Sequence, residues 1–279
     1  MAMAINTNIS SINAQRQLNQ TNNNLSTSME RLSSGLRVNS AKDDAAGLAI
    51  SNKMTSQIRG MTVATRNAND GISLAQTAES AMGTMTETMQ RMRDLAIQSA
   101  NDAGVSGGDR AKLQEEFKQL NDELTRIITN TEFNGKKIIS GSLAAGLAVQ
   151  VGANIASDNQ IAISIADLAT SIASVTTASI GSAAGASGAL AAVDALDTAI
   201  KSIDTSRAKL GAIQNRFTTT ITNLQSSIEN QSAARSRITD TDFAAETANL
   251  SRNQILQQAG TAMLAQANQG GQSVLSLLR

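Results

Sequence analysis

The sequence of 279 residues contains no cysteine, histidine, tryptophan, tyrosine or proline. Cysteine and histidine are the usual ligands of zinc, haem, iron–sulfur and blue-copper sites, so these centres are not expected. Nucleophilic sites of the Cys–His and Ser–His–Asp types are excluded as well, because the base that activates the nucleophile is missing. A chain without disulfides leaves its redox compartment open. The sequence therefore predicts no cofactor, no metal and no catalytic site.

Aromatic residues make up 1% of the chain, although hydrophobic residues make up 41%. Aromatic side chains bury the most area and dominate compact cores, so a globular enzyme is a poor match. The abundant alanine, leucine, methionine and glutamine favour helices, and no proline interrupts them. The 23 basic residues balance the 23 acidic ones, whereas a nucleic-acid-binding protein normally carries a basic face. A mainly α protein that binds no nucleic acid is expected.

Long hydrophobic runs are also absent, since no stretch approaches the ~18–20 apolar residues of a membrane span. The first ten residues show no basic segment followed by an apolar run, so a cleavable secretory signal is not expected. Export by a route that ignores such signals stays open.

Two long inner segments carry apolar residues every seven positions, which is typical of coiled-coil packing. The first series is Met54, Met61, Ala68, Ala75, Met82, Met89 and Ala96. The second series is Ala189, Leu196, Ile203, Leu210, Phe217, Leu224, Gln231 and Ile238. A helix from about Ala45 to Ala100 would be roughly 80 Å long, which predicts a rod.

The polar ends of the chain carry narrow apolar stripes that neither end can bury alone. The stripe positions that we expect to drive self-assembly are Leu18, Leu25, Leu32, Leu36, Leu256, Met263, Val274 and Leu277. Gly260, Ala267 and Gly270 continue the C-terminal stripe with small residues. Such seams require partner helices.

Shorter elements are expected between the long helices. Residues 101–109 read as a turn, residues 110–130 as a helix, and Asn134-Gly135 as a tight turn. Strands are expected at 137–139, 148–151 and 160–165, where Ile161, Ile163 and Ile165 alternate. Residues 168–188 show no clear period and are expected to form a loop. The expected fold is a long antiparallel coiled-coil-like helical rod, with a small β-hairpin region at its tip and paired terminal helices.

Three motifs with possible chemistry have plainer interpretations. Asp43-Asp44 and Glu115-Glu116 are paired carboxylates, but neighbours in sequence point to different helix faces and a rod offers no cleft. The glycine-rich residues 181–188 lack the lysine of a phosphate-binding loop. The methionines could suggest a site for a soft metal, but they recur at the seven-residue spacing of a helix core, which favours core packing. Three hypotheses are considered, two for a structural protein and one for an enzyme that acts at the surface. The enzyme is the weakest of the three.

Several segments resemble bacterial flagellins. The matching segments are Asn6–Arg16, Leu32–Ser51, Thr131–Gly135, Ile228–Glu246 and the closing Leu277–Arg279. The resemblance covers roughly residues 1–140 and 185–279, and the short middle implies a minimal form with only the two inner layers of the filament. It implies a division into 1–44 and 240–279 as the inner-tube helices, and 45–239 as the rod with a variable tip at about 140–188.

The resemblance implies a structural subunit that self-assembles into the flagellar filament and serves motility. It further implies unfolded type III export, an extracellular location, and an export chaperone, a filament cap and hook-associated junction proteins as partners. A hook–filament junction protein with the same ends is the alternative. Lys42, Asp43 and Asp44 would make inter-subunit contacts in the connecting segment, where Gly35 and Gly47 suit bends.

Two further expectations rest on the resemblance. Family members are sensed by Toll-like receptor 5 of vertebrate hosts, and alignment on the Phe-Asn-Gly turn places Arg91, Leu95 and Glu116 in that patch. Asp94 replaces a glutamate common in strong agonists. O-linked sugars are expected on the segment at the tip, at Ser171, Ser174, Thr176, Thr177 and Ser179.

Overall fold

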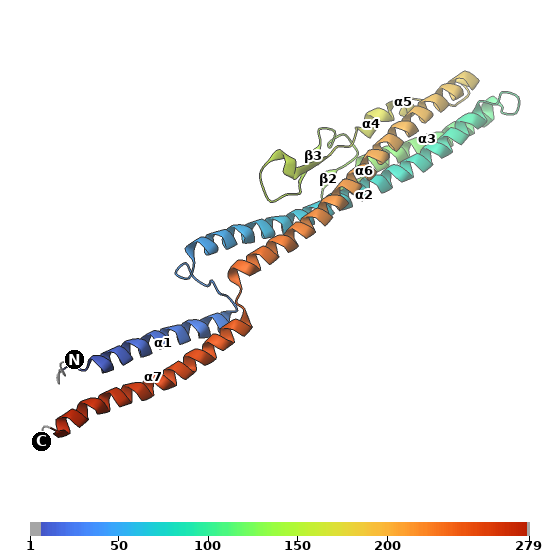
Figure 1. Ribbon diagram of the computed structural model, residues 1–279. Helices are drawn as coiled ribbons and strands as arrows, with labels where there is room; N and C mark the ends of the chain where they lie inside the picture. The colour runs from blue at the N-terminus through green and yellow to red at the C-terminus, as the bar shows by residue number, and fades with distance from the viewer. Residues whose placement is uncertain (1–6, 278–279) are drawn as a thin grey trace. The chain divides into compact units, whose positions relative to one another are not determined.

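The computed structural model describes the backbone of residues 7–277 and the side chains of residues 7–269. Over that range the chain forms seven α-helices and two small antiparallel strand pairs, which confirms a mainly α fold (Figure 1). The helices are α1 (Ile9–Ser34), α2 (Ala45–Ser99), α3 (Gly107–Asn130), α4 (Leu168–Ser171), α5 (Ala173–Thr176), α6 (Gly185–Thr239) and α7 (Phe243–Leu277). The strands are β1 (Glu132–Phe133), β2 (Lys136–Lys137), β3 (Leu147–Gln150) and β4 (Gln160–Ile163).

The chain divides into two compact units. The first, here the terminal unit, contains the residues up to Ser56 and those from Glu229 onward. The second, here the central unit, contains Gln57–Ile228. None of the described helices is long and apolar enough to cross a membrane.

In the central unit, α2 and α6 run antiparallel. Arg93 of α2 pairs with Asp197 of α6 at 2.6 Å, and Glu79 accepts a hydrogen bond from Gln214 at 2.9 Å. From the first pair to the second, the residue number falls on α2 and rises on α6, which is the pattern of an antiparallel pair.

The heptad positions of these two helices form the core of the central unit. Ala68, Ala75, Met82, Met89 and Ala96 are fully buried on α2. Leu196, Ile203, Leu210 and Phe217 are buried on α6. Alanine lets the backbones approach closely and methionine fills irregular gaps, so the helices pack densely with few aromatic rings. The predicted coiled-coil-like packing is confirmed.

Helix α3 joins this core through Phe117 and Leu124, which are both fully buried. Its start is fixed by Ser106, whose side chain accepts a hydrogen bond from the Asp109 amide at 3.3 Å. Arg110 donates from Nε to the Ser99 carbonyl at 2.9 Å, and so satisfies one of the free carbonyls at the end of α2. The polar turn between α2 and α3 is therefore closed by side chains at both ends.

The β region follows α3 in the sequence. Asn134 and Gly135 have φ angles of 49° and 74°, which is the tight turn expected between β1 and β2. Strand β4 pairs with β3, and Ile161 and Ile163 alternate into the core as predicted. The strand expected at 137–139 is wrong, because pairing ends at Lys137 and the buried Ile138 and Ile139 leave the ladder for the core.

The loop expected at 168–188 is wrong at both of its ends, whereas residues 177–184 form turns without a helix or strand. Residues 168–171 and 173–176 form α4 and α5, and α6 begins at Gly185. Leu168, Ile172 and Val175 are buried, and their spacing of four and three is that of one helix face. This short apolar period was hidden by the many serine, threonine and alanine residues around it.

The terminal unit is built on antiparallel α1 and α7. Asn8 donates to the Ala267 carbonyl at 2.8 Å, and Gln257 donates to the Asn22 side chain at 2.9 Å. The two connecting segments of this unit also pair through a bridge between Leu36 and Asp240. Gly35 ends α1 with a φ of 71°, a left-handed conformation that glycine adopts without strain.

We predict opposite effects from two glycine-to-alanine changes in α2. A Cβ at Gly71 would lie 2.8 Å from the ring of the buried Phe217, so Gly71→Ala should lower the free energy of unfolding by about 1–3 kcal/mol. Gly83 has no neighbour within 4 Å of such a Cβ, so Gly83→Ala should stabilise the helix by about 0.5–1 kcal/mol. Chemical denaturation of each variant, followed by circular dichroism, measures both. Equal shifts of the same sign would contradict the close contact between α2 and α6.

Candidate functional site: the assembly surface

The terminal unit exposes an unusual amount of apolar side chain. On α1 and α7, seven large hydrophobic side chains are between 46% and 67% exposed. They are Ile9, Ile12, Met29, Phe243, Ile255, Leu256 and Met263, and together they define what we call the assembly surface. Exposed apolar side chains recurring along two paired helices make these helices the candidate site of association.

The seam between α1 and α7 combines half-buried leucines with several polar contacts. Besides the two bonds given above, Ser11 donates to the Asn268 side chain at 2.9 Å. Arg31 lies 3.9 Å from the buried Glu246. Polar groups therefore hold the two helices in register, while much of their apolar surface points elsewhere.

The predicted stripes divide between seam and surface. On α1, Leu18, Leu25, Leu32 and Leu36 are all half-buried. On α7, Leu256 and Met263 are exposed, whereas the small Gly260 is half-buried against Leu18. Val274 and Leu277 lie in α7 beyond the residues whose side chains are described.

The half-buried face of α7 includes Asn253, Gln257, Gly260, Leu264 and Ala267. The predicted stripe contained Gly260 and Ala267 of this face but not the amides Asn253 and Gln257, which hydrophobic periodicity does not detect. Amide side chains at a three-to-four spacing were the available signal. The larger apolar residues of α7 are thereby left free for other contacts.

The connecting segment between α1 and α2 uses its carboxylates internally. Asp43 accepts hydrogen bonds from the amides of Asn39 and Ser40, at 3.1 and 2.8 Å. The bond from the Ser40 amide is the main cause that holds the pKa of Asp43 below its ordinary value. Asp44 caps α2 by accepting from the Gly47 amide at 2.8 Å. Lys42 is exposed.

Gly47 does not form a bend, so that expectation is wrong. It lies within the first turn of α2, where a Cβ would collide with the Asp44 carboxylate. Glycine at this position leaves room for the cap. The inter-subunit role predicted for Lys42, Asp43 and Asp44 stays a prediction.

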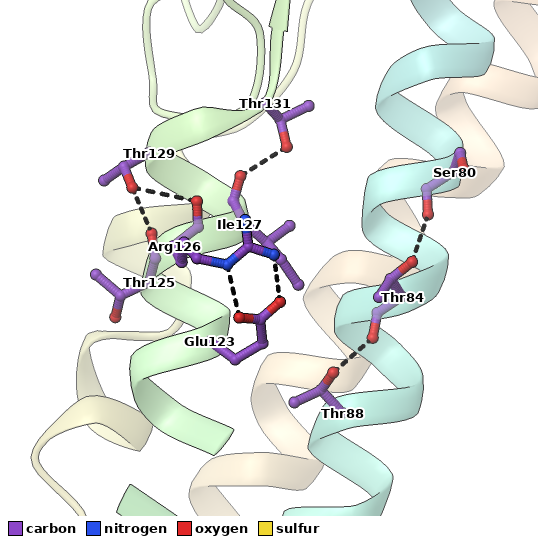
Figure 2. Close-up of polar contacts among 9 residues, drawn as sticks. All are labelled: Ser80, Thr84, Thr88, Glu123, Thr125, Arg126, Ile127, Thr129 and Thr131. Carbon is purple, nitrogen blue, oxygen red and sulfur yellow. Dashed lines mark hydrogen bonds and ion pairs between the residues drawn. The ribbon is translucent and has the colours of Figure 1, made fainter. Parts of the chain in front are cut away.

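A polar groove of about 730 Å³ lies between α2 and α3. Its walls carry hydroxyls that donate within their own helices, as Thr131 does to the Ile127 carbonyl at 2.6 Å (Figure 2). Arg126 pairs with Glu123 through two bonds of 2.6 and 2.7 Å, which lower the pKa of Glu123 and raise that of Arg126. Apart from the Arg126–Glu123 pair, the hydrogen bonds drawn in Figure 2 run from hydroxyls to main-chain carbonyls.

The predicted receptor patch is only partly on the surface. Arg91 donates from Nε and Nη2 to Oε1 of Glu116, at 3.0 and 2.6 Å, and both side chains are about half exposed. Leu95 is 1% exposed and belongs to the core, so its placement on a surface patch is wrong. An isolated subunit can present only Arg91 and Glu116 to a receptor.

Four of the five predicted glycosylation residues are exposed, namely Ser174, Thr176, Thr177 and Ser179. Ser171 is half-buried, and its hydroxyl donates to the Asp167 carbonyl at 3.1 Å. Glycosylation stays a prediction. Within residues 7–269, no group of three or more acidic side chains is placed to hold a metal ion.

Paired helices that keep large apolar side chains exposed outside their seam are typical of a subunit that associates. Comparison with known proteins agrees. Residues 5–144 match the bacterial flagellin N-terminal helical region, and residues 193–278 match the bacterial flagellin C-terminal helical region. The chain belongs to the bacterial flagellin family.

The chain is 45% identical to flagellin of Halalkalibacterium halodurans over 99% of its own length and all of the relative's. The crystal structure of Bacillus cereus flagellin covers 61% of this chain and 94% of its own, at 29% identity and a TM-score of 0.50. A hook-associated protein from Vibrio parahaemolyticus covers 71% of this chain and 100% of its own, at a TM-score of 0.59 but only 12% identity. The last likeness shows a common fold alone.

We predict that the turn at Asp43 is sensitive to acid below the ordinary titration range of aspartate. The pKa of Asp43 is lowered in the folded chain, so its ionised carboxylate stabilises the turn fully above the unfolded-state pKa. That stabilisation is lost as pH falls through the folded-state pKa. The amide resonances of Asn39 and Ser40 should follow this titration in NMR spectra, and Asp43→Asn should abolish it. A midpoint at or above the ordinary aspartate value would contradict the bonds described.

Proposed function

We propose that this chain is the structural subunit of a bacterial flagellar filament, and that copies polymerise through the assembly surface of α1 and α7. The carrying observation is that seven large apolar side chains of α1 and α7 stay exposed beside a seam that already holds polar contacts and half-buried leucines. Because these side chains are about half exposed in the subunit, burial by a partner gains each about half of the ~1.5–3 kcal/mol of a fully exposed one. The flagellin family supplies the context in which that partner is a second copy of the chain.

The filament is favoured over the hook–filament junction. Flagellin likeness extends over nearly the whole chain at 45% identity. The hook-associated structure shares only the fold.

Export of the unfolded chain through the flagellar type III channel is part of the proposal, and so is an extracellular filament. The sequence has no cysteine and no proline. Refolding after export therefore waits for neither disulfide formation nor slow X-Pro isomerisation. An export chaperone that covers the apolar side of α7 before assembly, a filament cap and hook-associated junction proteins complete the set of partners.

The division expected from the sequence is retained as a proposal for the filament. Residues 1–44 and 240–279 would form the inner tube, and 45–239 the outer layer. The compact units of the subunit divide within α2 and α6 instead, at residues 56/57 and 228/229.

The filament proposal predicts that the double change Ile255→Gln and Leu256→Gln blocks polymerisation and leaves the subunit folded. Both side chains are largely exposed, so the thermal unfolding curve should not move. Loss of their burial between copies should raise the critical concentration by roughly tenfold or more. Sedimentation and electron microscopy measure the polymer.

The matched control is Leu190→Gln, which changes an equally exposed leucine on α6 in the central unit. It should polymerise like the unchanged chain. Normal filaments from the double variant, at an unchanged critical concentration, would refute the proposed role of the assembly surface.

Recognition by Toll-like receptor 5 is proposed through the exposed Arg91–Glu116 pair. Arg91→Ala should weaken receptor signalling by roughly tenfold or more, because arginines at interface centres contribute strongly. Arg93→Ala is the control, since Arg93 makes a comparable ion pair with Asp197 two positions along α2. Reporter cells treated with monomeric protein measure both. Equal losses from the two variants would contradict a specific role for Arg91.

A further inference from the structure

The methionines of this chain fall into two groups. The sequence has ten, of which Met1 and Met3 lie outside the described residues. Met82, Met85, Met89 and Met92 are fully buried on α2, Met61 is buried, and Met54 is half-buried. Met29 and Met263 are instead 58% and 65% exposed, and both belong to the assembly surface.

Exposure decides which thioethers a peroxide can reach. A sulfur lone pair of methionine attacks one oxygen of hydrogen peroxide, the S–O bond forms as the O–O bond breaks, and the second oxygen leaves as water. The sulfur loses two electrons to the peroxide, and the product is the polar, chiral sulfoxide. Core methionines are shielded from this reaction as long as the fold stays closed.

We propose that Met29 and Met263 are oxidation sites through which hydroperoxides block polymerisation without unfolding the subunit. The inference rests on the proposed function, because it requires that the assembly surface becomes buried between copies. A sulfoxide oxygen carried into such an interface loses its water and needs a new hydrogen-bond donor. An apolar contact is thereby replaced by an unsatisfied polar group.

The two methionines act at separate places along the helix pair. Met29 lies two residues before Arg31, which pairs with Glu246 near the start of α7. Met263 lies one turn beyond Gly260, which faces Leu18 of α1. Met263 also follows the exposed Leu256 by seven positions, so both occupy the same side of α7. Oxidation therefore damages two distinct parts of the assembly surface.

Neither methionine supports the fold of the isolated subunit through burial. Oxidation at these positions should leave the thermal unfolding curve unchanged, whereas oxidation within the α2 series would open the core. Loss of assembly with retained folding therefore separates the proposed effect from general oxidative damage.

The test treats monomeric protein with hydrogen peroxide, removes the peroxide, and follows oxidation at every methionine by peptide mass mapping. Met29 and Met263 should be oxidised before Met82, Met85, Met89 and Met92. The critical concentration for polymerisation should rise by roughly tenfold or more, with an unchanged melting curve. Reduction by methionine sulfoxide reductases should restore polymerisation.

Leucine variants assign the effect. In the double variant Met29→Leu and Met263→Leu, peroxide should leave the critical concentration at the value that the same variant shows without peroxide, although the variant keeps Met1 and Met3. The matched control Met54→Leu, which replaces a half-buried methionine of the same unit, should stay peroxide-sensitive.

Each contrary result has a distinct meaning. Failure of the untreated chain to polymerise would overturn the proposed function and this inference with it. Normal polymerisation after full oxidation of Met29 and Met263, or a double variant that stays sensitive, would overturn the inference alone. Oxidation of the core methionines at the same rate would overturn the claimed selectivity.

Discussion

The dry seam between α2 and α6 is the interaction on which the central unit depends. Its members alternate between alanines such as Ala68 and Ala75 and longer side chains such as Met82 and Phe217. Small residues allow close backbones, and unbranched methionines fill the remaining gaps, so dense packing is reached with four phenylalanines in the whole chain. Helix α3, the strand pairs and the short helices α4 and α5 add their apolar faces to this seam.

The seam of the terminal unit is mixed. Its helices meet through half-buried leucines together with side-chain amides, hydroxyls and one distant ion pair. Hydrogen bonds of this kind add only about 0.5–1.5 kcal/mol each, since water competes for the same groups. They fix the register and direction of the two helices. The connecting segments supply a second restraint, because the Arg37 amide donates to the Thr239 carbonyl at 2.7 Å.

Sequence periodicity predicted the long helices well, since a heptad pattern sustained over fifty residues has few alternatives. It also predicted the turn at Asn134-Gly135, because asparagine and glycine readily adopt the positive φ angles of a tight hairpin turn. It failed where burial depends on distant partners. Leu95 was placed on a surface although it is buried in the core of the central unit, and Leu256 was assigned to a self-assembly stripe without any sign from the sequence that it stays exposed in the subunit. Leu168, Ile172 and Val175 were missed because their helices last a single turn each.

Large apolar side chains exposed on a helix pair are a poor arrangement for an isolated protein and a sound one for a polymer. Each copy keeps its own fold through the central unit, so the terminal unit is free to exchange water for neighbours. The net charge of zero lets copies approach without long-range repulsion. Because every copy carries the same apolar surface, contacts that are individually modest repeat along the whole assembly. The aromatic-poor, proline-free composition and the exposed helices thus both fit a subunit whose stability depends in part on contacts with other copies of the chain.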